Sequence, residues 1–426
     1  MSNFLVITGP YAGHVAPTVP IVHKLVKRGH DVVWITGRQF QKQVERAGAV
    51  FHPMPIERDP NGMEIYDFYR KLKERKGVFQ IDYWIKHVFL DACPREIEVI
   101  DSILKNFPVD IVIGDTVSYG IYFLSEMRGL PYAQISLLPM SLHSCDTAPF
   151  GMGLLPGTSL ITKIRNRFLN FFTRHVLLRG VTKYANMTRL KLGLEPLNGP
   201  FLGAMFENAL LTLHTSTPAF EYPRSDQPDT VHFIGPVLLE RDHTFEHPDW
   251  WCDLESAETV VLVNQGTLAM NLDNLIIPAI KGLGGEQMLV VVVPLKKEQL
   301  GELPDYVRSE PFIPFAHLLD HVDVMVTNGG YGSTQYAMAH GIPLVVSGGT
   351  EDKMEVAARV EWAGTGINLR KHRPSHIEVR DAVKEVLSNP IYRQNAKRVQ
   401  ANFAQYDAPA RAAELLETAV SGLSSP

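Results

Sequence analysis

The stretch VDVMVTNGGYGSTQYAMAHGIPLVVSGGTEDK, residues 322–353, decides the fold. It contains an apolar strand, a glycine-rich turn, a helix, a second apolar strand and an acidic turn. A strand–helix–strand unit of this kind is typical of a parallel α/β sheet. Both turns follow the carboxyl ends of strands, where open α/β sheets bind ligands. We therefore expect a phosphate at the first turn and a hydroxyl-rich group at the second.

The same alternation of strands and helices continues through both halves of the chain. Strands are expected at NFLVIT, DVVWIT, DIVIGD, PYAQIS and, as the last of its half, NALLTLHT; the second half adds TVVLVNQGT, MLVVVVP, EPFIPF, DVMVTNGG, IPLVVSGG and GTGINL. This order predicts two Rossmann-like domains of doubly wound parallel sheet that face each other across a cleft. We place the N-terminal domain at residues 1–235, a linker at 236–255 and the C-terminal domain at 256–395. The helices of residues 396–426 are expected to pack back on the N-terminal domain.

Composition excludes several classes of protein. With 426 residues a single core is not expected, and 45% hydrophobic and 20% charged residues are typical of a globular protein. The net charge is −5 and no long basic run is present, which argues against binding to nucleic acid or to a membrane surface. The three cysteines are scattered, as in a reducing cytosol. No signal peptide, membrane anchor or metal-ligand spacing is evident, so we expect a cytoplasmic protein, monomeric or weakly dimeric.

Two glycine-rich turns can bind phosphate. A turn at the start of a helix offers unpaired N–H groups and the positive end of the helix dipole. The candidate ligands are Asn328, Gly329, Gly330, Gly332 and Ser333 in NGGYGST, and Gly266 and Thr267 in NQGT. Each turn by itself is also compatible with a tight connection that binds nothing. Two such turns in one domain suit a diphosphate better than either does alone.

The acidic turn GGTEDK and a histidine in the first half are further candidates. Asp352 can accept hydrogen bonds from sugar hydroxyls, although Glu351, Asp352 and Lys353 are also compatible with a solvated loop. His14 follows the first strand and can act as a base at neutral pH, whereas a lone histidine is more often structural. Asp115 ends another strand and can orient that imidazole, or it can simply cap a helix. GPYAGHVAP is not G-x-G-x-x-G and no acidic residue ends DVVWIT, which argues against a nicotinamide dinucleotide.

With these motifs in view, the chain resembles the family 1 UDP-glycosyltransferases, which have the GT-B fold. GHVAPTVPIVHKLVKRGHDVVWIT is similar to the opening signature of that family. FIPFAHLLDHVDVMVTNGGYGSTQYAMAHGIPLVVSGGTEDK is similar to its donor-binding signature. The resemblance extends over nearly the whole length. It implies a soluble enzyme that moves a hexose, by default glucose, from a UDP-sugar to a small hydroxylated acceptor, with inversion and without a metal or other cofactor.

The resemblance also implies a role for each matching residue. His14 would be the general base and Asp115 its partner. Phe312 would stack on the base and the backbone of Ile313 would bond the uracil edge. The phosphates would be bound by Gly266, Thr267, Asn328, Gly332 and Ser333, the ribose by Gln335, and the sugar by Asp352. Gly330 of the glycine turn and Lys353 are further candidate contacts of the donor.

Four departures leave the donor open. Asn328 replaces the usual histidine, Tyr336 a ribose-binding glutamate, Lys353 a glutamine and Phe312 a tryptophan. A dTDP-sugar or another UDP-sugar therefore stays an alternative donor. The resemblance also implies that the two domains close on the substrates, with the linker near Pro236 as the hinge.

The acceptor is expected to bind to two insertions in the N-terminal half, near residues 54–91 and 142–183. Their candidate contacts are Tyr66, Phe68, Tyr69, Phe79, Tyr83, Trp84, Phe89, Met140, Phe150, Met152 and Leu154. Such a lining suits a flavonoid, phenol or polyketide, with a macrolide, sterol or lipid as alternatives, although many of these side chains can instead pack a helical subdomain. An epimerase, a sugar hydrolase and a non-catalytic nucleotide-sugar-binding protein are the competing functions.

Overall fold

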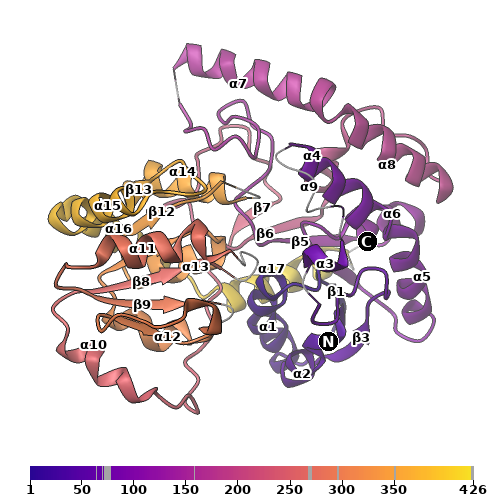
Figure 1. Ribbon diagram of the computed structural model, residues 1–426. Coiled ribbons are helices and arrows are strands. Elements are labelled where there is room, and N and C mark those ends of the chain that lie inside the picture. The colour runs from indigo at the N-terminus through magenta and orange to yellow at the C-terminus, as the bar shows by residue number, and fades with distance from the viewer. Residues whose placement is uncertain are drawn as a thin grey trace.

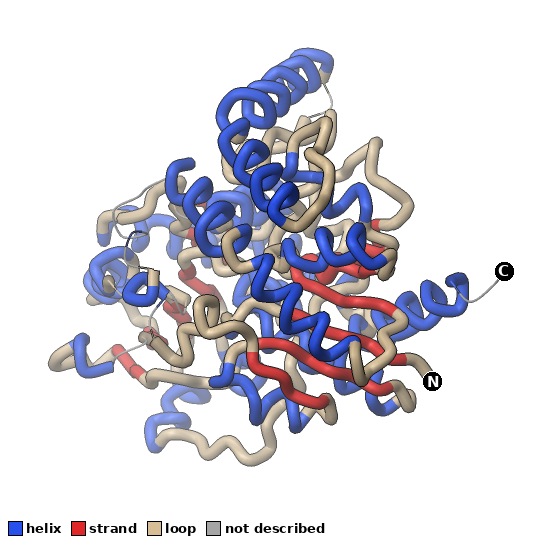
Figure 2. The backbone as a smooth tube through the Cα atoms, turned by 90° about the vertical axis from the view of Figure 1, so that its right-hand side faces the viewer, coloured by secondary structure: helices blue, strands red, loops and turns tan. Residues whose placement is uncertain are grey.

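The computed structural model describes residues 1–63, 65–69, 71, 78–157, 159–266, 271–294, 297–349 and 352–423. Two parallel sheets with helices on their faces form two halves of the molecule (Figure 1). Figure 2 shows strands of the N-terminal sheet running side by side with helices around them. The expected α/β architecture of two Rossmann-like domains is confirmed.

The N-terminal sheet has seven strands in the order β3-β2-β1-β4-β5-β6-β7. Its strands are β1 Asn3–Ile7, β2 Asp31–Thr36, β3 Val50–Pro53, β4 Ile111–Asp115, β5 Tyr132–Ser136, β6 Leu211–His214 and β7 Val231–Phe233. Its helices are α1 Ala12–Lys27, α2 Gln41–Arg46, α3 Ile65–Phe68, α4 Val78–Tyr83, α5 Cys93–Leu104, α6 Tyr119–Arg128, α7 Leu160–Phe172, α8 Arg179–Lys191 and α9 Phe201–Asn208, with short η1 Arg38–Phe40, η3 Trp84–Leu90 and η4 Thr173–Leu177. Because the central strands are buried on both faces, they are nearly continuous apolar runs.

The C-terminal sheet has six strands in the order β10-β9-β8-β11-β12-β13. Its strands are β8 Val260–Asn264, β9 Leu289–Val293, β10 Val307–Ser309, β11 Val324–Thr327, β12 Leu344–Val346 and β13 Gly366–Asn368. Its helices are α10 Cys252–Ser256, α11 Ile276–Leu283, α12 Phe315–Leu318, α13 Tyr331–Ala339, α14 Lys353–Ala363, α15 His376–Ser388 and α16 Pro390–Phe403, followed by α17 Ala408–Leu423; η5–η8 are single turns at Asp249–Trp251, Leu272–Asn274, Lys297–Leu300 and Leu319–His321.

Two local predictions differ from the structure. EPFIPF, residues 310–315, is not a strand, because the edge strand β10 ends at Ser309. Pro311 and Pro314 lack the N–H that a strand would donate, so this segment becomes a connection to α12. β6 is not the last strand of its half either, because β7 lies inside VHFIGP and pairs with β6.

The C-terminal helices divide between the two halves. In α16, Ala396, Val399 and Phe403 pack into the core of the C-terminal sheet. The following helix, α17, packs Leu416 and its neighbours into the N-terminal core against α1. Glu417 pairs there with Arg28 and His30, each at 2.8 Å. The chain therefore crosses between the two halves a second time between α16 and α17.

Candidate active site

His14 and Asp115 lie at the ends of neighbouring strands. β1 pairs with β4 in parallel, so the turn that follows β1 meets the last residue of β4. His14, in the first turn of α1, places Nδ1 2.7 Å from Asp115 Oδ2. With Nδ1–H donating to the carboxylate, the lone pair of the ring lies on Nε2. Among the described residues none is hydrogen-bonded to that Nε2, so it can accept a proton.

Asp115 is held as a carboxylate by its surroundings. It is fully buried and also accepts hydrogen bonds from Gly9 N at 2.7 Å, Val117 N at 3.1 Å and Ser118 Oγ at 2.8 Å. Burial alone would raise its pKa, but the charge and hydrogen bond of His14, with smaller contributions from Gly9 and Arg58, lower the pKa to about 2. A permanently ionised partner fixes the tautomer of His14 and stabilises its protonated form.

An aromatic cluster borders His14. The ring of Tyr11 lies edge-on to His14 with centroids 5.4 Å apart, and it also meets Trp84 at 6.3 Å. Trp84 in turn contacts Tyr69 and stacks on Phe89 at 5.6 Å. Residues that precede α1, follow α3 and lie in η3 therefore converge on one apolar surface beside the imidazole. Sequence reasoning missed Tyr11, although it lies three residues before His14.

The other residues expected to contact the acceptor lie in different parts of the N-terminal half. Phe68 joins the same aromatic group through Tyr69, whereas Tyr83 lies against the ring of His87 and packs on the neighbouring hydrophobic core. Met140 is buried in a small separate cluster and Phe79 is 70% exposed. The side chain of Tyr66 lies outside the described residues. The remaining three candidates, Phe150, Met152 and Leu154, are partly buried on one loop of residues 149–157, which we call the acceptor loop.

The two glycine turns of the C-terminal sheet meet. Asn328 Nδ2 donates to the carbonyl of Gln265, next to Gly266. Gly266 has φ +77°, and a Cβ there would lie 3.3 Å from the Asn328 amide, so a side chain would crowd this junction. One N–H of the Asn328 amide remains for a ligand. Thr267, the other candidate of this turn, lies outside the described residues.

The second turn opens α13. Gly330 is the residue that precedes the helix, and Gly332 is exposed in its first turn with no atom near its Cβ position. Ser333 Oγ donates to the carbonyl of Gly330 at 3.0 Å. Gln335 is only 4% exposed and lies on the inner side of the helix, beside Tyr331. The exposed donors of this turn are therefore backbone N–H groups of its first residues.

Asp352 and Lys353 lie where β12 leads into α14. Asp352 is the N-cap residue of α14, and its carbonyl accepts from Glu355 N at 2.9 Å. Lys353 is 9% exposed and lines a pocket together with Gln265, Asn328, Ser347 and His372. The pocket thus joins both glycine turns to the turn between β12 and α14. Ser347 and His372 gave no signal in the sequence, since neither belongs to a motif.

The two residues expected to contact the uracil base, Phe312 and Ile313, follow β10. Phe312 is 73% exposed, whereas Ile313 is buried and its side chain belongs to the core. An exposed ring beside a buried neighbour is available for stacking. Tyr336, which stands where relatives are expected to have a glutamate, contacts the linker between the two halves. Its Oη accepts a hydrogen bond from the linker residue Leu239 N at 2.6 Å.

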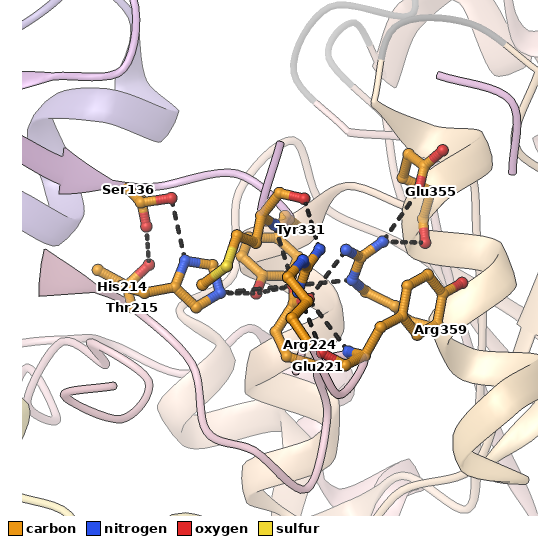
Figure 3. A network of polar contacts seen from close by, with 10 residues as sticks. Ser136, His214, Thr215, Glu221, Arg224, Tyr331, Glu355 and Arg359 are labelled. Carbon is orange, nitrogen blue, oxygen red and sulfur yellow. Dashed lines mark hydrogen bonds and ion pairs between the residues drawn. The ribbon is translucent and has the colours of Figure 1, made fainter. Parts of the chain in front are cut away.

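A buried ionic network joins the two halves, and no sequence motif predicts it (Figure 3). Glu221, which follows β6, is at its centre. Its carboxylate accepts two hydrogen bonds from Arg359 of α14, and it also contacts Arg224, His214 and Tyr331. Burial would raise the pKa of Glu221, but these charges, Arg359 first, lower it well below the usual value.

One group of side chains in the described residues has the spacing of metal ligands. Cys145, Asp146 and Asp226 come close enough to share an ion, but both carboxylates already accept hydrogen bonds from Ser225 or Cys145. Within the same part of the chain, no helix combines the length and apolarity needed to cross a bilayer.

The chain matches known families and proteins over most of its length. Residues 4–139 match the glycosyltransferase family 28 N-terminal domain, and residues 280–419 match the erythromycin biosynthesis protein CIII-like C-terminal domain. The chain is 40% identical to 4'-demethylrebeccamycin synthase of Lentzea aerocolonigenes, over 98% of this chain and 99% of that protein. It is 32% identical to UDP-glycosyltransferase 2 of Phaeomoniella chlamydospora, over 94% and 91%.

Solved structures show the same fold. The glycosyltransferase of kitacinnamycin superposes with a TM-score of 0.76 at 20% identity, over 98% of this chain and 99% of that one. The calicheamicin glycosyltransferase CalG4 does so with a TM-score of 0.71 at 20% identity, over 99% and 98%. The protein is therefore an enzyme of the family 1 glycosyltransferases, with the GT-B fold.

Proposed function

We propose that this glycosyltransferase moves glucose from UDP-glucose to a hydroxyl of a small lipophilic acceptor, with inversion at the anomeric carbon. The observation that carries the proposal is the 2.7 Å contact between His14 and Asp115 beside an aromatic surface. The UDP-sugar donor rests on relatives named UDP-glycosyltransferase and UDP-glucosyltransferase. A flavonoid, phenol or polyketide fits the aromatic lining.

His14 removes a proton from the acceptor in this mechanism. Nε2 accepts the hydroxyl proton while the acceptor oxygen attacks the anomeric carbon from the side opposite the diphosphate. The bond from that carbon to the diphosphate oxygen breaks, and UDP leaves with its electron pair. Asp115 stabilises the imidazolium that forms. The proton then passes from His14 to solvent.

The charge that develops on the leaving diphosphate needs a counter-charge. Backbone N–H groups at the start of α13, the remaining amide hydrogen of Asn328 and the ammonium of Lys353 supply it. Asp352 would hold the sugar hydroxyls and Phe312 the uracil ring. We therefore propose that transfer needs no metal ion or other cofactor. An unchanged rate in the presence of EDTA is the expected result.

The first experiment is mass spectrometry of reactions that pair UDP-glucose with flavonoids, phenols, macrolides and sterols. A product heavier by one hexose supports the proposal and ranks the acceptors. Reactions with His14→Ala are the control for non-enzymatic transfer. Product from another UDP-sugar or a dTDP-sugar, and none from UDP-glucose, would overturn the donor assignment and direct attention to Lys353. Release of free sugar without any acceptor product would indicate a hydrolase instead.

A further inference from the structure

Glu355 connects the acceptor loop to the donor side of the enzyme. Its Oε1 accepts hydrogen bonds from two backbone N–H groups of that loop, Gly151 N at 2.8 Å and Gly153 N at 2.9 Å. Glu355 itself lies in the first turn of α14, and its own N–H donates to the carbonyl of Asp352 at 2.9 Å. One helical turn therefore carries both the proposed sugar-binding residue and the attachment point of the acceptor loop.

The acceptor loop lies directly against α14, and Glu355 is itself held in place by Arg359. Gly153 has φ +58°, and a Cβ there would lie 3.0 Å from the carbonyl of Met354, so the loop backbone lies against α14. The other carboxylate oxygen of Glu355 accepts from Arg359 Nη1 at 3.1 Å. Arg359 is fixed in turn by the bidentate contact to Glu221. Since all three charged side chains are at most 5% exposed, water competes little for these contacts.

We propose that Glu355 is a positioning residue that sets the acceptor loop against the sugar-side turn. Between its two anchored glycines the loop carries Met152, with Phe150 and Leu154 on either side, so the placement of three candidate acceptor contacts depends on one carboxylate. Binding of the donor near Asp352 would then order the loop before the acceptor arrives. The kinetic part of this proposal rests on the proposed transfer reaction, whereas the structural link does not.

The test compares Glu355→Ala with Glu355→Gln. Alanine removes the acceptor of both loop N–H groups, so the KM for the acceptor is expected to rise about tenfold while the KM for UDP-glucose stays within about twofold. Glutamine keeps a carbonyl oxygen toward the loop and should restore most of the acceptor KM. Glu361→Ala is the matched control, since Glu361 is on the same helix but pairs with Arg370 near the surface. Equal changes in both KM values, or the same change in the control, would overturn the proposal.

Hydrogen–deuterium exchange of the peptide that covers residues 149–157 needs no turnover. In the wild type we expect slow exchange that UDP-glucose slows further; in Glu355→Ala we expect fast exchange that the donor does not change. Exchange that is the same in both proteins would overturn the positioning role. If the wild type transfers no sugar but shows the donor-dependent protection, the proposed reaction fails while the link between donor turn and loop stands.

A different observation concerns the surface. The continuous helical segment of α7 and η4 buries Asn166 and Thr173, while its apolar side chains face outward. Ile161, Ile164, Phe168, Phe171, Phe172 and Val176 are between 39% and 81% exposed. Figure 1 shows α7 at the edge of the molecule, away from both sheets. Globular helices usually bury the apolar stripe, so this orientation marks an interaction surface.

The charge of the segment indicates what covers this surface. Residues 160–183 contain six lysines and arginines and no acidic residue, in a chain whose net charge is −5. Lys163 pairs with Asp146, and Arg165 and Arg167 flank the apolar stripe. A second copy docked helix to helix would bring like charges together. We infer that the surface docks on an anionic lipid bilayer, which offers both an apolar interior and negative headgroups. This differs from the expectation drawn from the net charge of the whole chain, because the basic residues are concentrated in this one segment.

Sedimentation with lipid vesicles tests this inference. The protein is expected to sediment with vesicles of phosphatidylcholine and phosphatidylglycerol, less with phosphatidylcholine alone, and less at high salt. The triple variant Ile164→Gln/Phe168→Gln/Phe171→Gln should stay in solution, whereas Ile377→Gln/Ile391→Gln, exposed positions on α15 and α16, should bind normally. Failure of the wild type to sediment would overturn the inference. So would a wild-type dimer in solution that the triple variant dissociates, since a second copy would then cover the surface.

Discussion

Arg359 and Glu221, 138 positions apart in the chain, form a two-point ion pair with Nε–Oε1 at 2.7 Å and Nη2–Oε2 at 2.9 Å. Arg359 belongs to α14 of the C-terminal half, and Glu221 follows β6 of the N-terminal half. Both are essentially inaccessible to water, and Arg359 also lies over the ring of Tyr222 at 4.4 Å. The pair therefore fixes α14 relative to the N-terminal sheet.

Removing one partner of this pair should destabilise the protein strongly. Arg359→Met leaves the Glu221 carboxylate buried beside fewer cations, and the free energy of unfolding should fall by about 3–5 kcal/mol. Urea denaturation measures the change. The ion pair of Arg370 with Glu361 near the surface provides the control, since Arg370→Met should lower the free energy of unfolding by less than about 1 kcal/mol. If Arg359→Met and Arg370→Met lose similar stability, the buried pair does not hold the two halves together.

Removing the proposed base should nearly abolish transfer without preventing the binding of the donor. His14→Ala is expected to lower kcat by about 10²–10⁴-fold, because proton removal then falls to water. UDP affinity, measured by calorimetry, should not change, since His14 lies on the N-terminal side of the site. Near-normal transfer by this variant would eliminate His14 as the base.

Asp115→Asn tests whether Asp115 orients the ring of His14, because this variant keeps the imidazole but changes its hydrogen-bond partner. The asparagine amide can donate to His14 Nδ1 and so favour the tautomer with a hydrogen on Nε2, which cannot accept the proton. We expect a loss of kcat approaching that of His14→Ala, with an unchanged UDP affinity. A variant that keeps more than about half of the wild-type kcat would show that the 2.7 Å contact is structural only.

The low pKa of Asp115 predicts how stability depends on acid. Its pKa is about 2 in the folded protein and 3.8 ordinarily, so the unfolded chain binds more protons between these values. The ionised Asp115 therefore adds about 2 kcal/mol to the free energy of unfolding. This stabilisation is fully present above pH ~4 and is lost as the pH falls toward ~2. Unfolding measured between pH 5 and 2 should therefore depend less on pH in Asp115→Asn than in the wild type. Parallel curves would contradict the assigned pKa.

Local signals in the sequence were enough for most strands of the two sheets and for the pairing of His14 with Asp115, but they missed β7 and wrongly predicted a strand at residues 310–315. Apolar runs and glycine turns are short-range features, and adjacent parallel strands bring their carboxyl ends together. The partners of Glu221 could not be found in this way, because a buried ion pair depends on tertiary distances. The insertions were equally ambiguous, since Trp84 and Phe79 look alike in sequence but one joins the aromatic cluster and the other is exposed.

Phe312 offers the cleanest test of how the nucleotide binds. Because 73% of its side chain is exposed, Phe312→Ala should leave the melting temperature unchanged. Loss of a stacked base costs about 1–3 kcal/mol, so the Kd for UDP should rise by about 5–150-fold. Phe312→Trp restores a larger ring and should bind UDP at least as tightly as the wild type. Phe79→Ala, at a similarly exposed position in the N-terminal half, is the matched control and should not change UDP affinity. If both alanine variants bind UDP like the wild type, the uracil ring does not stack on Phe312.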